Sequence, residues 1–122
     1  MKIRIKGNSV RLRLTKTEVE TFAAEGVYAE STMFAAKKLH YKLKTKASIS
    51  ALEADFIEDT ITVYFPEQLK DTWANSTQVG YSNQVEWNDD NKLSILVEKD
   101  FTCIDDTIED QCDNYPNPKL ER

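Results

Sequence analysis

Hydrophobic and charged residues alternate along the first fourteen positions of the chain. In residues 2–6 and 10–14, an aliphatic residue occupies every second position and lysine or arginine fills the positions between. A period of two is typical of a half-buried β-strand. The pair Gly7-Asn8 between the segments favours a tight two-residue turn, because glycine tolerates the positive φ that such turns need. The pattern therefore predicts a β-hairpin.

This hairpin has one apolar face and one positively charged face. Its register sets Arg4 opposite Arg11 and Lys2 opposite Arg13, while the aliphatic residues share the other side. Like charges directly opposed across two strands destabilise a sheet by a few tenths of a kcal/mol up to about 1 kcal/mol per pair. A negatively charged group is therefore expected beside them, supplied either by the protein or by a bound anion.

Carboxylates of the protein's own occur in a second predicted hairpin. Residues 52–56 alternate apolar positions with Glu53 and Asp55, and residues 61–65 continue the alternation after a turn near residues 58–60. If the two hairpins are neighbours in one sheet, the acidic face of the second neutralises the basic face of the first. We prefer this interpretation, because alternating charge is common on a solvated sheet face.

The remaining pattern predicts two helices and four more strands. Thr15 and Glu18 have the spacing of a capping box, and Gly26 suits the left-handed residue that follows a helix. Pro66 at a first helical position predicts a short second helix, with Trp73 in the core. No internal repeat is visible. The further strands are expected at residues 27–34, 38–44, 78–87 and 92–100.

Together these elements predict an α+β fold, with a strongly bent antiparallel sheet or partial barrel of about eight strands and two short helices. A length of 122 residues suits a single domain. We assign residues 1–104 to that domain. Residues 105–122 lack hydrophobic periodicity, and we expect them to form an acidic C-terminal strap or a partly disordered tail of the same domain.

Composition excludes several classes of site. The three glycines are too scattered for a glycine-rich phosphate-binding loop, and a lone histidine, His40, cannot form a paired-histidine zinc site. Cys103 and Cys112 lack C-x-x-C spacing, and we expect two free thiols. No apolar run approaches the ~18 residues of a membrane span. We therefore expect a cytoplasmic protein that needs no cofactor and has no membrane partner.

Charge is distributed unevenly along the chain. Residues 1–46 carry eleven basic and four acidic residues, whereas residues 47–122 carry five and seventeen, so that +7 and −12 combine to the net charge of −5. Because the chain is acidic overall and its aromatic residues do not interleave with basic ones, we do not expect it to bind nucleic acid. Its partner is expected to be an unidentified protein or an anionic small molecule.

Three groups of residues offer chemistry. His40 stands among lysines and not beside the orienting carboxylate that a general base usually has, and we interpret it as a surface histidine. The carboxylates of residues 105–113 are oxygen ligands of the kind that Ca²⁺ prefers, but their spacing fits no EF-hand, and we expect no metal site. The strongest candidate is an anion-binding face formed by cations of the predicted strands, namely Arg4, Arg11, Arg13, Lys42 and Lys44.

If these charges point inward from a curved sheet, they form a cleft for a phosphorylated small molecule, an arrangement similar to that of triphosphate-tunnel enzymes. Those enzymes carry an E-x-E-x-K run. The nearest run here, Glu18-Val19-Glu20-Thr21-Phe22, has phenylalanine at the position of the lysine. The resemblance therefore covers a pattern of charge and no catalytic motif.

Both ends of the chain resemble one family. The opening run MKIRIKGNSVRLRLTKTEV and the closing runs VEKDFTC and EDQCDNYPNP are similar to segments of a family of small bacterial proteins of unknown function. The resemblance implies a complete single-domain bacterial protein and transfers no activity, cofactor or site. We therefore expect a non-catalytic binding or accessory protein. The alternative is an enzyme or sensor that binds a phosphorylated small molecule on the basic face.

Overall fold

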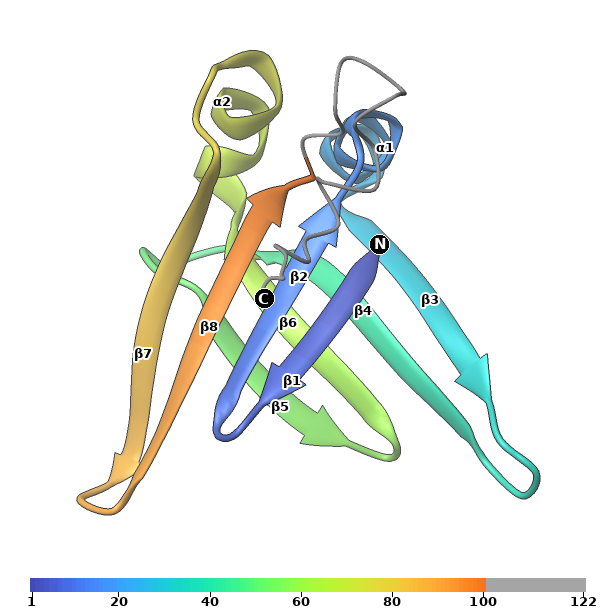
Figure 1. Cartoon of the computed structure of the whole chain (residues 1–122). Coiled ribbons are helices and arrows are strands. Elements are labelled where there is room, and N and C mark those ends of the chain that lie inside the picture. The colour runs from blue at the N-terminus through green and yellow to red at the C-terminus, as the bar shows by residue number, and fades with distance from the viewer. Residues whose placement is uncertain (101–122) are drawn as a thin grey trace, which may run out of the picture.

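Eight strands, two α-helices and a short 3-10 helix form residues 1–100, the part of the chain that the computed structural model describes (Figure 1). The predicted tail, residues 105–122, lies outside that part. In chain order the elements are β1 (Lys2–Lys6), β2 (Ser9–Leu14), α1 (Lys16–Glu25), β3 (Val27–Met33), β4 (Lys38–Lys46), β5 (Glu53–Ile57), β6 (Thr60–Pro66), η1 (Glu67–Leu69), α2 (Lys70–Asn75), β7 (Gly80–Asn88) and β8 (Asn91–Lys99).

The strands divide into two sheets of four. Sheet A has the order β1-β2-β8-β7 and sheet B the order β3-β4-β6-β5. Strands that follow each other within a sheet form antiparallel hairpins, whereas the inner pairs, β2–β8 and β4–β6, are parallel. The α+β class is confirmed, but a single bent antiparallel sheet or partial barrel is not. The reason is that each α-helix carries the chain from one sheet to the other.

The order of elements repeats once along the chain. The first half runs β1-β2-α1-β3-β4 and the second runs β5-β6-α2-β7-β8, so that each half contributes one hairpin to each sheet. The two parallel inner pairs join the halves. This repeat is one of topology, which explains why the amino-acid sequence showed no internal repeat. It also leaves both helices at the same end of the two sheets (Figure 1).

The first hairpin forms in the predicted register. Arg4 pairs with Arg11 and Lys2 with Arg13, and Gly7 in the turn has φ +54°. The positive φ costs little at glycine, which has no Cβ to clash with the backbone.

The predicted capping box at the start of α1 is confirmed. The Thr15 hydroxyl accepts a hydrogen bond from the Glu18 N–H, and the Glu18 carboxylate accepts one from the Thr15 N–H at 2.8 Å. At the other end Gly26 has φ 82° and donates its N–H to the Phe22 carbonyl at 2.7 Å. Residues local in sequence therefore set both ends of α1.

The core lies between the sheets and beneath the helices. Trp73 on α2, Phe22 on α1 and Phe65 on β6 are fully buried, and their ring centroids lie 5.2–6.2 Å apart. Trp73 is thus in the core as predicted. Pro66 differs slightly from its expected position, because it is the last residue of β6 and the N-cap of η1. Through these ring contacts both helices pack against β6.

An ion-pair cluster joins the chain start to α1 and sheet B. The Met1 ammonium group contacts the carboxylates of Glu18 and Glu30, and the Tyr28 hydroxyl donates to Glu18 at 3.4 Å. Burial alone would lower the pKa of the Met1 ammonium, but its hydrogen bonds to the two carboxylates outweigh that effect and raise it. For Glu18 the two effects have the opposite signs. Burial alone would raise the pKa of its carboxyl group, but the hydrogen bonds from the Met1 ammonium and the Thr15 N–H outweigh that effect and lower it.

These two pKa changes predict a stability plateau. Glu18, whose folded pKa is lowered, stabilises the fold above its ordinary value of 4.5, and this contribution is lost as pH falls through the folded pKa. The Met1 ammonium stabilises below its ordinary value of 8.0, and its contribution is lost as pH rises through the raised pKa. We expect the melting temperature to be highest between these two values, measured by thermal unfolding across the pH range.

A matched variant isolates the charge of Glu18. Glu18→Gln keeps a side chain able to accept the capping hydrogen bond and removes the negative charge. It should therefore melt earlier at neutral pH and lose less further stability between about pH 5 and about pH 3 than the unmodified protein. Equal losses in both proteins would contradict the assignment.

Candidate anion-binding site

The β1–β2 hairpin presents its cations on the face of sheet A that points away from the core. Leu12 is fully buried in the hydrophobic core, and Ile3, its partner across the hairpin, packs against that core. Because side chains alternate between the faces of a strand, Arg4, Arg11 and Arg13 lie on the outer face. They do not point into the space between the sheets, as the tunnel-like alternative required.

A small pocket of about 200 Å³ opens on this outer face, lined by Arg4, Lys6, Ser9 and Arg11. Three of its four lining residues are cations. The Ser9 hydroxyl donates to the Lys6 carbonyl at 2.7 Å, which closes the turn side of the pocket. The pocket thus gathers positive charge from both strands of one hairpin.

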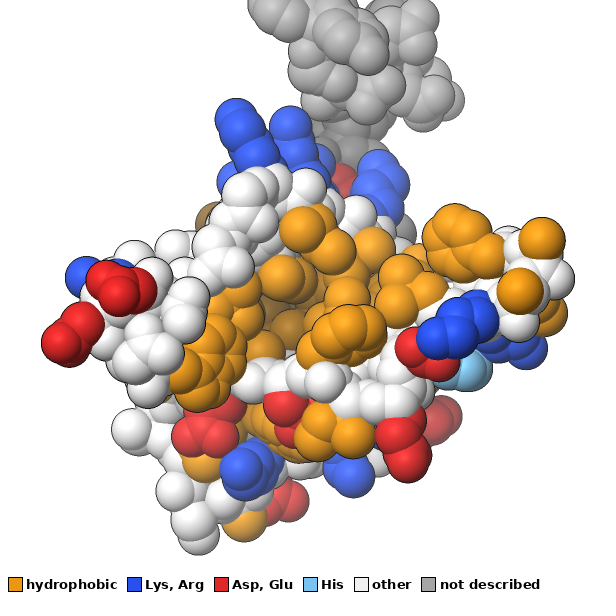
Figure 2. All heavy atoms as spheres, turned by 90° about the horizontal axis from the view of Figure 1, so that it is seen from below, with side chains coloured by type: hydrophobic (Ala, Val, Ile, Leu, Met, Phe, Trp, Pro, Cys, Tyr) orange, Lys and Arg blue, Asp and Glu red, His pale blue; other side chains and the backbone are white. Residues whose placement is uncertain are grey.

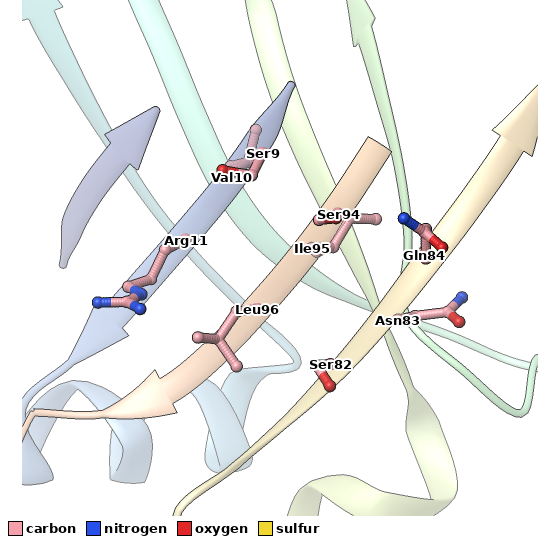
Figure 3. A pocket seen from close by; sticks show the side chains of 9 residues that line it. All are labelled: Ser9, Val10, Arg11, Ser82, Asn83, Gln84, Ser94, Ile95 and Leu96. Atoms are coloured by element: carbon pink, nitrogen blue, oxygen red, sulfur yellow. The ribbon is translucent and has the colours of Figure 1, made fainter. Parts of the chain in front are cut away.

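A larger groove adjoins the pocket through Ser9 and Arg11, which line both. Its volume is about 510 Å³, and its lining side chains come from three neighbouring strands, β2, β8 and β7 (Figure 3). On the outer face these strands offer hydroxyl and amide groups and one apolar side chain, from Ser94, Leu96, Ser82 and Gln84. The groove therefore extends the positively charged pocket with neutral hydrogen-bonding groups.

The carboxylate that neutralises this face is Glu98 of β8. Its Oε1 lies 3.0 Å from Nε of Arg13, to which it is hydrogen-bonded, and 3.7 Å from Nε of Arg11. Lys2 pairs with Asp100 at 3.2 Å. The expectation that Glu53 and Asp55 supply this charge is wrong, because β5 belongs to sheet B.

Arg4 and Lys6 form no ion pair among residues 1–100. Both side chains are exposed, and both line the small pocket. Within the described residues, the outer face of sheet A thus holds three more cations than carboxylates: the cations are Lys2, Arg4, Lys6, Arg11, Arg13 and Lys92, and the carboxylates are Glu86, Glu98 and Asp100. Its positive charge is only partly balanced.

The other two predicted site residues, Lys42 and Lys44, lie elsewhere. They alternate along β4 with the buried Tyr41 and Leu43, so they lie on the outer face of sheet B. The structure therefore brings Arg4, Arg11 and Arg13 together and leaves the two lysines on a different sheet.

The acidic face of the second hairpin neutralises sheet B rather than sheet A. In the register of that sheet, Lys44 and Tyr64 share a row with Glu53, and Lys42 shares one with Asp55. The Tyr64 hydroxyl donates to Asp55 at 2.9 Å, and this hydrogen bond, with burial and negative charge nearby, raises the pKa of Tyr64. The positive charges of Lys42 and Lys44 therefore lie in the same rows of sheet B as the carboxylates of Asp55 and Glu53.

The other residues considered for chemistry are His40 and the groups near the end of the chain. His40 is exposed on the outer face of β4, as expected of a surface histidine. Among residues 1–100, no three His, Cys, Asp or Glu side chains are grouped to hold a metal ion, and no helix is long and apolar enough to cross a membrane. Cys103, Cys112 and the carboxylates of residues 105–113 lie outside the described residues.

Sequence reasoning missed the part of the groove that comes from β8 and β7. Ser94 lies beside Ser9, and Leu96 lies beside Arg11, only because β8 pairs in parallel with β2. A parallel pair between distant segments leaves no local turn signal. The alternation of β8 predicts which of its side chains face outward, but it does not predict that β2 is the strand beside it.

Comparison with known protein families gives a match over nearly the whole chain. A family model described as "Family of unknown function (DUF7009)" matches residues 1–119 of the chain. No curated protein and no solved structure matches. The near full-length match agrees with the resemblance noted at both ends of the chain, and it brings no activity or site with it.

Proposed function

Because the chain belongs to the family of unknown function DUF7009, its role must come from its geometry, and we propose that it is a binding protein for a phosphorylated small molecule. The observation that carries this proposal is the pocket formed by Arg4, Lys6, Ser9 and Arg11. The ligand's phosphate group occupies this pocket, and its remainder lies along the groove between β2, β8 and β7.

The charges of the pocket suit a phosphate. Arg4 and Arg11 are directly opposed, so their guanidinium groups repel each other until an anion binds between them. Arginine binds phosphate through two parallel N–H···O bonds, and Lys6 adds a third positive charge. Binding therefore removes an unfavourable interaction and forms charge-assisted hydrogen bonds.

The groove suits the neutral part of such a ligand. Ser94, Ser82 and Gln84 supply hydroxyl and amide groups within reach of a sugar or another polar group. Leu96 offers an apolar surface between them. This mixture gives orientation and specificity, which a positive charge alone does not provide.

The pocket favours binding over catalysis. None of the four residues that line it is a carboxylate, a histidine or a thiol. Glu98, the carboxylate that contacts Arg11, forms ion pairs with both Arg13 and Arg11. The Ser9 hydroxyl already donates a hydrogen bond to the Lys6 carbonyl. A bound phosphate ester would thus be held without a general base beside it.

Calorimetric titration with inorganic tripolyphosphate at about 0.1 M ionic strength, where the Debye length is about 10 Å, tests the proposal. We expect saturable binding that Arg4→Gln or Arg11→Gln weakens about tenfold or more each, the loss associated with one charged hydrogen bond. The matched control is Lys42→Gln with Lys44→Gln, which removes two cations from sheet B and should leave affinity within about twofold, since exposed charges beyond a Debye length are screened.

A second variant gives an effect of opposite sign. Glu98→Gln releases Arg11 and Arg13 from their carboxylate and is expected to strengthen tripolyphosphate binding. Absence of binding, or equal weakening by the control on sheet B, would show that the outer face of sheet A is not the site.

A further inference from the structure

A hollow lined by hydrophobic side chains opens between the two sheets, at the end of the molecule opposite α1 and α2 (Figure 2). Its walls are the inner faces of the strands near their hairpin turns. In a closed two-sheet core such side chains are buried, because those of the two inner faces fill the space between the sheets. Here that space is left open at one end.

Burial decreases along the strands toward this end. On β8 the inner-face residues Val97 and Ile95 are buried, whereas Leu93, the next on that face, is only partly buried. On β1, Ile3 packs against the core, but Ile5, two positions further along the same face of the strand, is 57% exposed. The helix end of the core is therefore closed, and the turn end is open.

Sheet B shows the same change. Val63 of β6 is fully buried, while Ile61, its neighbour on the inner face, is partly buried. Phe56, which pairs with Ile61, is 66% exposed. Large apolar side chains from both sheets thus line the open end without covering one another.

Two polar contacts join the sheets beside the hollow. On one side the Met1 ammonium binds Glu30 of β3, and on the other the Asn83 amide of β7 donates to the Leu52 carbonyl at 2.8 Å. These two links join the sheets along both edges. The hollow between them is lined mainly by apolar side chains.

This lining selects the chemistry of the occupant. A peptide segment would bring an N–H and a C=O with each residue, and burying these without partners is costly. A hydrocarbon chain has no such groups. Charges of both signs surround the opening at the strand turns, so they select no ionic head group; they are Lys6, Lys37, Lys38, Lys92, Glu58, Asp59, Glu86, Asp89 and Asp90.

We propose that the hollow is a binding site for a small molecule with a neutral hydrocarbon chain, separate from the anion site on the outer face. The chain enters at the turn end and lies between Ile5 of sheet A and Phe56 of sheet B. Its affinity comes from removing the exposed apolar surface of these side chains from water. The inference does not depend on the proposed phosphate ligand.

The neutral fluorescent probe N-phenyl-1-naphthylamine, displaced by linear alcohols, tests this site. We expect saturable binding of the probe, and competition that strengthens about fourfold per added methylene from octan-1-ol to dodecan-1-ol, which corresponds to ~0.8 kcal/mol per buried methylene. Arg4→Gln should leave both unchanged. Probe binding without chain-length dependence would overturn the proposal.

Adjacent residues of β5 provide matched variants. Phe56 faces the hollow, whereas Ile57, 61% exposed, lies on the outer face of the same strand. Phe56→Ser or Ile5→Ser is expected to weaken dodecan-1-ol about tenfold, while Ile57→Ser leaves it unchanged; thermal unfolding confirms that each variant is folded. Equal effects of the three variants would contradict the site. So would a concentration-dependent dimer that Phe56→Ser dissociates, because a second copy would then cover the hollow.

Discussion

Replacing Trp73 with alanine is expected to lower the free energy of unfolding by about 3–5 kcal/mol, the usual range for removing a fully buried large aromatic side chain. Trp73 packs against Phe22 and Phe65, and its indole N–H donates to the Val79 carbonyl at 3.2 Å. The variant would therefore leave a cavity beneath both helices and remove one of the two hydrogen bonds that the Val79 carbonyl accepts, the other coming from the Lys99 N–H. Chemical denaturation followed by circular dichroism measures the change.

The chain supplies its own control for this experiment. Trp87, at the far end of β7, is 55% exposed and belongs to no part of the core. Trp87→Ala should change the free energy of unfolding by no more than about 0.5 kcal/mol. If the two tryptophan variants are equally destabilised, Trp73 does not lie at the centre of the core with Phe22 and Phe65.

Gly80→Ala is expected to destabilise the fold by about 3 kcal/mol, at the upper end of the range for overpacking. A Cβ at this position would lie 2.1 Å from the Val97 carbonyl oxygen and 2.7 Å from Cα of Glu98. Both are backbone atoms of β8, the strand that pairs with β7, so they cannot move without breaking the ladder. The displaced strand carries Glu98, so the variant should also disturb the ion pairs with Arg11 and Arg13.

Gly7→Ala separates this clash from the conformational preference of glycine. Gly7 has φ +54° but no atom within 4 Å of an added Cβ, so only the cost of a left-handed alanine remains, about 1–2 kcal/mol. Thermal unfolding of both variants gives the comparison. A Gly80→Ala protein as stable as Gly7→Ala would mean that β7 and β8 approach each other less closely than described.

Local patterns predicted the elements of this fold well. The register of the first hairpin, the capping box of Thr15 and Glu18 and the left-handed Gly26 all follow from residues near one another in sequence. The division into two sheets does not follow, because it depends on parallel pairing between β2 and β8 and between β4 and β6. Such contacts between distant segments carry no turn chemistry that a single sequence displays.

The candidate site was predictable only in part for the same reason. Alternation correctly puts Arg4 and Arg11 on one face of a hairpin, but it cannot tell which sheet a strand joins, so Lys42 was grouped with them. The neutralising role of Glu98 depends on the same parallel pairing. Phe56 has the alternation of a core residue, and only the separation of the sheets makes it the wall of a hollow.

The central claim is that the outer face of sheet A binds a phosphate-containing anion. Nuclear magnetic resonance of isotope-labelled protein, titrated with tripolyphosphate, tests it directly by locating the bound anion. We expect the largest amide shifts to fall on Arg4, Lys6, Ser9 and Arg11, with smaller ones at Ser94 of the adjoining groove. Shifts centred on Lys42 and Lys44 of sheet B, or no saturable shifts at low salt, would contradict it.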